Sequence, residues 1–231
     1  MSRLLYFAIF MMISYTSYSQ IKFSEAEIML HNQYVWRGQK LGTGASIEPS
    51  VTFSSGNFSL NTWAAFTFDN SYKEFDLIPS YQFEHFTLTL LDYYIPEIEG
   101  TNRYLNFREG ESRHSLELTA DNSSIEKQRL KWLIGIFFAG DQNEETGNPN
   151  YSTYIEVKYP FAILGIDTEP FVGMTPFRGL YADKFAFVNA GIKFSKELDL
   201  KLPFTIPLHL SFISNPTTNQ TFVTFGGGIA F

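Results

Sequence analysis

Apolar and polar residues alternate one by one along most of the chain, which is the period of a β-strand with two different faces. In the segment RLKWLIGIF, Leu130, Trp132 and Ile134 share one face, whereas Lys131 and Gly135 share the other. The same period of two runs through NFSLNTWAAFTF, TYIEVKY and AFVNAGIKF. No stretch shows the 3.6-residue period of an amphipathic helix. The pattern therefore predicts an all-β protein.

The alternating segments predict about twelve strands, with ten as the alternative because Pro203 and Pro207 interrupt the eleventh segment. Many segments are longer than the 5–6 residues that are usual in soluble sheets. They are long enough to cross a bilayer as tilted strands, which takes about 9–11 residues. We expect the strands near 25–37, 45–54, 57–69, 72–83, 85–96, 113–122, 128–140, 151–160, 164–175, 184–195, 201–214 and 220–231.

The connections between these segments are alternately short and long. SSGN and EH are brief, whereas EIEGTNRYLNFREGES and DQNEETGNPN, on the other side, are long. Short turns at one end and longer loops at the other are typical of an outer-membrane barrel. The sequence therefore predicts a transmembrane antiparallel up-and-down β-barrel. An exported soluble β-sandwich is the alternative, and it would be expected to have shorter strands.

The first nineteen residues are expected to be a signal peptide. Arg3 precedes an apolar run, Leu4–Ile13, and small residues follow at Ser17 and Ser19. The run is too short for a helix that spans a bilayer. We therefore divide the chain into a signal peptide at 1–19 and a barrel domain at 20–231, exported to the bacterial outer membrane and embedded in its lipids.

Charge and composition narrow the function further. The net charge is −7, and removal of residues 1–19 takes away only Arg3, which leaves −8. An acidic chain without a Lys/Arg cluster does not suit nucleic-acid binding. There are no cysteines, so neither a disulfide framework nor thiol chemistry is available. No cofactor or metal is expected.

Aromatic residues at the strand ends predict the interface with the membrane. Strand 25–37 ends in Tyr34 and Trp36, which would share the lipid-facing side, while Arg37 would face the lumen. Gly38 would turn the chain into the first loop. The C-terminal Phe231 completes the expected aromatic girdle, and the strand that it ends resembles the signal by which the barrel-assembly machinery recognises its clients.

The first third of the barrel domain also resembles a known family. QYVWRGQKLGTGASIEPSVTF, NTWAAF, EFDLIPSYQF and LTLLDYYIPE follow one another over residues 26–96, in an order similar to that of the TorF-like porin family of Gram-negative bacteria. The resemblance implies a barrel with a porin role and no particular substrate. It is carried by Tyr34, Arg37, Gly38, Pro49, Trp63, Glu74, Asp76, Tyr81, Tyr93, Tyr94 and Pro96.

The polar faces of the strands would line the lumen, and acidic residues exceed basic ones among them. A charged constriction would select small polar solutes and disfavour anions, whereas lumenal ion pairs would instead close the barrel. The candidates for selectivity are Glu74, Asp76, Arg37, Glu27, His31, Glu48, Lys131, Glu156 and Lys158. Further charged or titratable positions on these faces are Glu117, Asp167, Glu169, Lys193 and His209.

The sequence thus predicts a narrow porin for small polar solutes, with a non-conducting structural or adhesive barrel as the alternative. A barrel enzyme is the third reading and is not favoured. His114 and Ser115 are adjacent in a strand, so they point to opposite faces and cannot pair. His31 and His209 both read as lumenal, but no serine in a recognisable motif accompanies them.

Overall fold

The computed structural model describes residues 20–108, 111–143 and 146–231. The predicted signal peptide, 1–19, lies outside these residues. The described part of the chain is all-β, with strands at β1 (Lys22–His31), β2 (Tyr34–Trp36), β3 (Gln39–Leu41), β4 (Ser46–Ser55), β5 (Phe58–Thr67), β6 (Lys73–Gln82), β7 (Thr87–Tyr94), β8 (His114–Asp121), β9 (Lys131–Ala139), β10 (Thr153–Lys158), β11 (Phe161–Ile163), β12 (Ile166–Thr175), β13 (Ala186–Leu198), β14 (Ile206–Asn215) and β15 (Gln220–Ala230).

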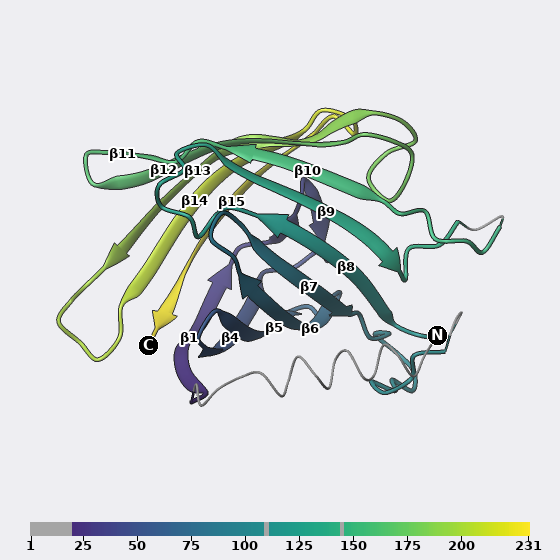
Figure 1. The fold of residues 1–231 in the computed structure, drawn as a ribbon, viewed down its shortest axis with the longest axis horizontal. Helices are drawn as coiled ribbons and strands as arrows, with labels where there is room; N and C mark the ends of the chain where they lie inside the picture. The colour runs from purple at the N-terminus through teal and green to yellow at the C-terminus, as the bar shows by residue number, and fades with distance from the viewer. Residues whose placement is uncertain (1–19, 109–110, 144–145) are drawn as a thin grey trace.

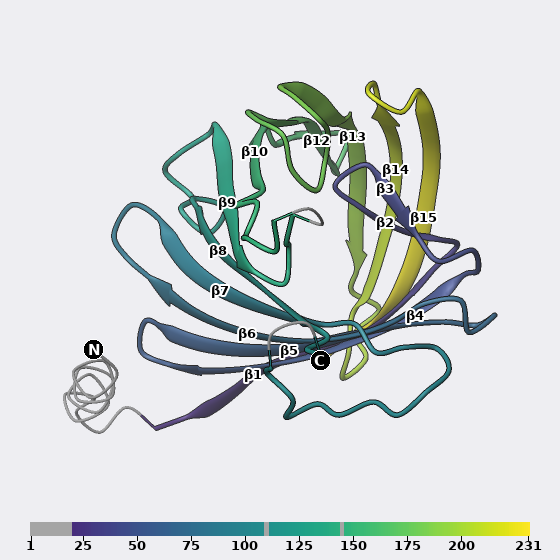
Figure 2. The same ribbon diagram turned by 90° about the vertical axis from the view of Figure 1, so that its right-hand side faces the viewer.

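Twelve of the described strands form a closed antiparallel barrel (Figures 1 and 2). Each pairs with the next along the chain, and β1 closes the sheet against β15, where Ile28 is opposite Ile229. Strand β11 continues the line of β10 along β12, because both pair with β12 on either side of Tyr159 and Pro160. Proline lacks the amide donor that the ladder would need at this point. The predicted up-and-down barrel of about twelve strands is confirmed.

The alternative of ten strands is wrong, because the segment with two prolines does form a strand. Pro203 lies in the connection before β14. Pro207 is the second residue of β14 and pairs with Glu197 of β13, but the ladder to β15 begins only at Leu208. Each proline therefore lies where the barrel does not need its missing donor.

The two ends of the barrel differ in the length of their connections. At the end that holds both termini of the sheet, the strands are joined by 56–57, 83–86, 122–130, 164–165 and 199–205. We call this the short-turn end. At the opposite end, the long-loop end, the connections are 32–45, 68–72, 95–113, 140–152, 176–185 and 216–219.

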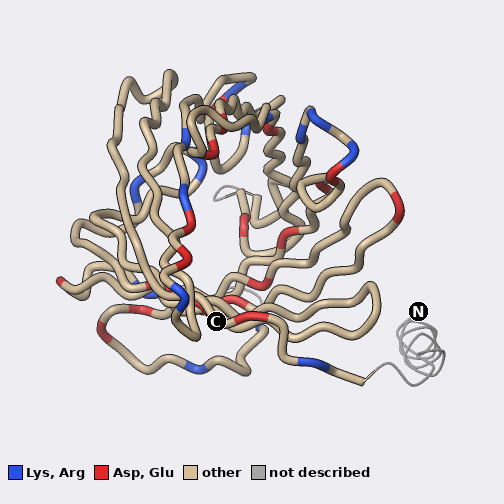
Figure 3. The backbone as a smooth tube through the Cα atoms, turned by 90° about the vertical axis from the view of Figure 1, so that its left-hand side faces the viewer, with Lys and Arg blue, Asp and Glu red and all other residues tan. Residues whose placement is uncertain are grey.

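The wall of the barrel is apolar outside and polar inside. Large side chains such as Phe66, Leu118 and Phe225 are exposed on the outer surface. The neighbouring positions on the same strands point inward and are polar: Thr67, Glu117 and Thr224 are buried. Acidic and basic positions are spread over most of the wall strands, but β5, β14 and β15 carry none (Figure 3). Within the described chain, no helix is both long and apolar enough to cross a membrane.

Candidate functional site

The candidate site is built by a hairpin that stands apart from the wall. Strands β2 and β3 pair with each other, with Trp36 opposite Gln39, and form a separate two-stranded sheet (Figure 2). The two residues of the turn, Arg37 and Gly38, both have positive φ, at 48° and 76°. Positive φ at both central positions is the requirement of a type I′ turn, which suits the twist of a tight hairpin.

The tip of the hairpin touches the wall at β13 and β14. A Cβ atom at Gly38 would lie 2.0 Å from the carbonyl oxygen of Val188 in β13, so only glycine fits there. Asn215 of β14 donates from its side-chain amide to the carbonyl oxygen of Gly38, at 3.1 Å. At the base of the hairpin, the side-chain amide of Gln33 donates to the carbonyl oxygen of Val223, at 2.9 Å. The hairpin is therefore anchored to β15 at its base and to β13 and β14 at its tip.

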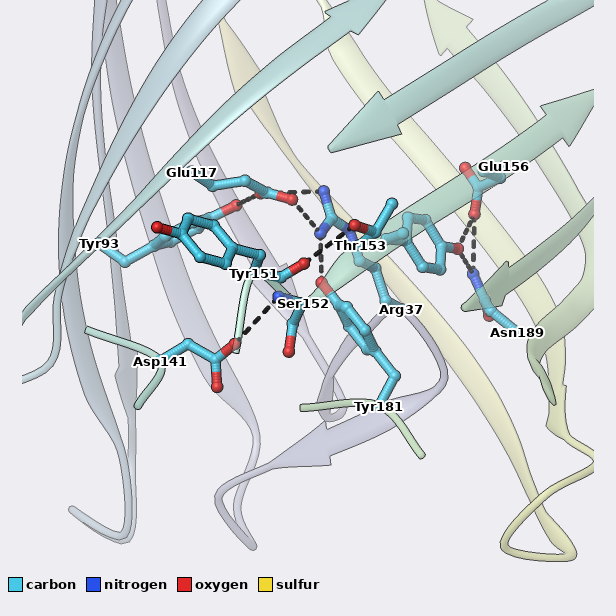
Figure 4. A network of polar contacts seen from close by, with 11 residues as sticks. Arg37, Tyr93, Glu117, Asp141, Tyr151, Ser152, Thr153, Glu156, Tyr181 and Asn189 are labelled. Carbon is cyan, nitrogen blue, oxygen red and sulfur yellow. Dashed lines mark hydrogen bonds and ion pairs between the residues drawn. The ribbon is translucent and has the colours of Figure 1, made fainter. Parts of the chain in front are cut away.

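Arg37 at the tip is held by a carboxylate and by aromatic rings. Its guanidinium donates to both oxygens of Glu117 in β8, at 2.6 and 3.1 Å (Figure 4). The guanidinium carbon lies 4.6 Å from the ring centre of Trp36, 4.4 Å from that of Tyr154 and 5.9 Å from that of Tyr181. Such contacts combine a bidentate ion pair with cation–π attraction in a largely buried site.

The partners of Arg37 are themselves fixed by the wall. The Tyr93 hydroxyl donates to the second oxygen of Glu117, at 2.7 Å. Glu117 is fully buried, and Gly135 on the adjacent strand leaves room for it, since a Cβ there would lie 2.1 Å from its Oε1. Arginine with positive φ costs about 1–2 kcal/mol of backbone strain, so these contacts must hold the turn in place.

A second polar group continues from the arginine site along β10. The Tyr154 hydroxyl donates to Glu156, and the Asn189 amide donates to both Tyr154 and Glu156, at 2.8 and 2.9 Å (Figure 4). Lys158 then bridges Glu156 and Glu169, with its Nζ at 3.2 and 3.5 Å from the two carboxylates. The network thus links the arginine site to residues of β10, β12 and β13.

The hairpin borders a cavity of about 640 Å³ inside the barrel. His31 and His209 face each other in its wall, with ring centres 4.5 Å apart. The Nδ1 atom of His31 lies 2.9 Å from Glu48, near enough for an ion pair although not aligned as a hydrogen bond. Within the described residues, no three His, Cys, Asp or Glu side chains are placed to hold a metal.

The structure gathers most of the predicted lumenal residues around this cavity. Six of the predicted candidates line it: Glu27, His31, Arg37, Glu48, Glu156 and Lys158. Three of the further lumenal positions, Glu169, Lys193 and His209, line it too. Lys131 does not, because its Nζ donates to the carbonyl oxygen of Ile125 at the short-turn end, at 2.6 Å.

Glu74 and Asp76 form a separate acidic pair on β6. Both are buried, at 3% exposure. Tyr72 donates its hydroxyl to Glu74, at 3.1 Å, but Oδ1 of Asp76 has no hydrogen-bond partner in the described chain. Neither residue lines the large cavity. Glu74 and Asp76, which belong to the family-like stretch, are therefore buried in the barrel but lie away from Arg37 and the large cavity.

The prediction that Tyr34 and Trp36 belong to an outward aromatic girdle is wrong. Trp36 packs inside the barrel against the cluster that contains Tyr93 and Tyr181. Tyr34 packs on Trp63, with ring centres 5.4 Å apart, and both line the cavity. Strand β1 ends at His31, and the chain then turns inward. The rings of Tyr34 and Trp36 therefore do not continue the outward face of β1.

The third girdle residue lies at the end of the last strand. Phe231 is half-exposed, and its ring centre is 5.9 Å from that of Phe204 in the connection before β14. This position is on the short-turn end, where both termini of the sheet lie.

Three tyrosines of the arginine site were not among the candidates. Tyr154 lies on the same face of its strand as Glu156 and Lys158, and this polar face was visible in the alternation of TYIEVKY. Tyr93 was named only among the residues that carry the family resemblance, with no role in the lumen. Tyr181 belongs to the 176–185 loop, and no periodic pattern places a loop residue inside a barrel.

One acidic residue interrupts the apolar outer face of β7. Asp92 falls on the apolar face of β7, near its end, where it lies 2.6 Å from Nδ1 of His114. The Nε2 atom of His114 is 2.6 Å from the carbonyl oxygen of Tyr104 in the 95–113 loop. Both ring nitrogens are thus engaged by acceptors, so His114 ties this loop to the wall.

No family model matches the chain, and no curated protein matches it either. The barrel and its interior are therefore the features that bear on function.

Proposed function

We propose that the protein is an outer-membrane β-barrel that forms a narrow channel for small polar solutes. The observation that carries the proposal is a closed twelve-strand barrel with an apolar outside and a charged cavity inside, part of which is occupied by a hairpin. Lipid requires that every backbone group be paired within the protein, and a closed barrel meets that requirement. The expected signal peptide and the resemblance to the TorF-like porin family agree with this location.

The hairpin would set the width of the channel. Barrels of eight strands are filled by side chains, whereas barrels of sixteen strands leave an open channel. A twelve-strand barrel is intermediate, and here Trp36 and Arg37 fill part of its interior. We propose that β2–β3 is the constriction, with solutes passing only beside it or when it moves. The last strand would be the contact for the assembly machinery.

The lumenal charges would set the preference among solutes. The cavity is lined by four carboxylates, Glu27, Glu48, Glu156 and Glu169, together with Arg37, Lys158 and Lys193. A narrow passage bordered by acids raises the local concentration of cations and repels anions. We therefore propose a preference for small cationic or neutral polar solutes.

Conductance in a planar lipid bilayer tests this function. The refolded chain should insert, give discrete conductance steps and show a cation-selective reversal potential in a salt gradient. Slower migration of the protein on a denaturing gel after boiling should first show that the barrel has formed. Bilayers that stay silent after insertion of a folded barrel would contradict the channel.

A non-conducting structural barrel is the second candidate. It is favoured by one observation, the ion pairs and aromatic contacts that fix Arg37 across the interior. In that case the long loops 95–113 and 140–152 would be the contact surfaces at the long-loop end. A folded barrel that remains silent even without its hairpin would support this function over the channel.

A further inference from the structure

The environment of Arg37 has the composition of a receptor for a cation. Glu117 supplies a buried carboxylate, and Tyr93, Tyr154 and Tyr181 supply hydroxyls and ring faces around it. We name these four residues the guanidinium pocket. We infer that this pocket is a binding site for small solutes that carry a guanidinium group, and that Arg37 occupies it as an internal competitor when the hairpin is folded inward.

The geometry selects a guanidinium over an ammonium group. Two nitrogens of Arg37 donate to the two oxygens of Glu117, at 2.6 and 3.1 Å, a planar fork that a point-like ammonium cannot reproduce. The Tyr154 ring, 4.4 Å from the guanidinium carbon, offers a flat face on which a planar cation can stack.

The pocket is assembled without the hairpin. Tyr93, Glu117 and Tyr154 belong to the wall strands β7, β8 and β10, and Tyr181 belongs to the 176–185 loop. The Tyr93 hydroxyl bonds to Glu117, and the rings of Tyr154 and Tyr181 pack against each other, with centres 5.4 Å apart. Removal of Arg37 would therefore leave a formed site with a buried carboxylate that lacks its cation.

A solute can reach the pocket through the lumen. Tyr93, Tyr154 and Arg37 itself line the cavity of about 640 Å³, so the arginine is at the boundary between the pocket and the open interior. The hairpin that carries Arg37 pairs with no wall strand among the described ones, and its turn has positive φ at an arginine. A competing guanidinium would replace the ion pair while releasing this strained turn.

Competition with a tethered group sets the expected affinity. A group on a short tether behaves as if present at roughly millimolar concentration, so free guanidinium should bind the wild type weakly and bind better when Arg37 is absent. The passage of such solutes through the barrel rests on the proposed function, whereas their binding does not.

The test is calorimetric titration of the refolded full chain in detergent micelles with methylguanidinium. Arg37→Ala should bind it saturably, about tenfold more tightly than the matched variant Arg37→Ala/Glu117→Gln, because a charge-assisted pair is lost in the second. Methylammonium should bind Arg37→Ala about tenfold more weakly than methylguanidinium, because it lacks the fork. Equal binding by the two variants, or of the two cations, would overturn the inference.

A second variant covers the case in which Arg37→Ala does not fold. Arg37→Lys keeps a cation on the hairpin but loses the fork, so it should compete less and bind methylguanidinium more tightly than the wild type does. Unchanged affinity would overturn the inference. Binding without conductance in bilayers would reject the channel and keep the pocket, whereas conductance without binding would keep the channel and reject the pocket.

Discussion

Two carboxylates on the inner wall, Glu117 and Asp76, are equally cut off from solvent but differ in what surrounds them. Glu117 is fully buried and receives two bonds from Arg37 and one from Tyr93. Asp76 is 3% exposed, lies near Glu74, and has an oxygen with no hydrogen-bond partner in the described chain. Burial of a charge is unfavourable unless it is paired. The comparison indicates that Glu117 stabilises the inward position of the hairpin, whereas burial of the unpaired Asp76 carboxyl is unfavourable.

The largest effect should follow from breaking the paired site. Glu117→Ala leaves the Arg37 guanidinium buried without its counter-charge, which costs about 3–5 kcal/mol of unfolding free energy. Urea unfolding of the refolded barrel in micelles, followed by tryptophan fluorescence, measures this loss.

The matched control replaces both partners. In Arg37→Met/Glu117→Leu the buried charges are removed together, and well-packed apolar replacements of a buried pair are often neutral. This double variant should recover most of the stability lost in Glu117→Ala. A single variant as stable as the wild type would show that the pair does not hold the hairpin.

A smaller loss is expected from crowding the same carboxylate. Gly135→Ala places a Cβ where Glu117 Oε1 lies 2.1 Å away, so the carboxylate must shift and its fork with Arg37 is distorted. Overpacking of this kind typically costs about 1–3 kcal/mol, which the same urea titration measures. The control is Ala139→Gly, which changes a residue of the same strand without adding atoms. Gly147→Ala does not serve as a control, because Gly147 has positive φ. Equal stability of Gly135→Ala and the wild type would show that the Glu117 carboxylate does not lie against Gly135.

The unpaired site should respond in the opposite direction. Asp76→Asn keeps the size of the side chain and replaces a buried carboxyl that has no cation beside it with a neutral amide, so we expect unchanged stability or a gain of up to about 1 kcal/mol. The same urea titration measures it. A loss comparable to that of Glu117→Ala would mean that a cation pairs with Asp76.

The smallest effect concerns a carboxylate outside the barrel wall. Asp69 accepts bonds from the backbone amide and hydroxyl of Ser71, at 3.1 and 2.6 Å, and from the hydroxyl of Thr43. These bonds hold the pKa of Asp69 well below its usual range. A lowered pKa in the folded state stabilises the loop above the unfolded value, about 3.9, and this stabilisation is lost as the pH falls further.

The expected consequence is a small difference in acid sensitivity. Wild type should lose part of its thermal stability as the pH decreases below about 4, and Asp69→Asn should lack that part because it cannot titrate. Thermal unfolding followed at a series of pH values checks this. Parallel pH profiles for the two proteins would contradict the role of Asp69.

These contrasts also show how far the sequence predicts the structure. The alternation of β5 and β9 predicts their two faces, because a strand between two neighbours has no freedom to rotate. The alternation of β6 and β8 likewise predicts that Asp76 and Glu117 point inward. It does not predict which of them is paired, because the partner of Glu117 lies 80 residues away in the chain.

The sequence was misleading where regular structure ends. Tyr34 and Trp36 continue the alternation of β1, but β1 ends at His31 and a separate hairpin follows. The pair Arg37-Gly38 is a two-residue turn, and glycine at its second position was a local signal for a hairpin. The direction in which that hairpin folds depends on Glu117, Asn215 and Tyr181, which no local pattern brings together.

The role of the hairpin is tested most directly by the single-channel conductance of a barrel whose hairpin has been replaced. Residues 34–41 are exchanged for the same number of alternating glycine and serine residues, and boiling-dependent migration on a gel confirms that the barrel is formed. If β2–β3 is the constriction of a channel, the conductance in a planar bilayer should rise clearly above that of the wild type. Conductance equal to that of the wild type, in a folded barrel, would contradict the assignment of the hairpin as the constriction.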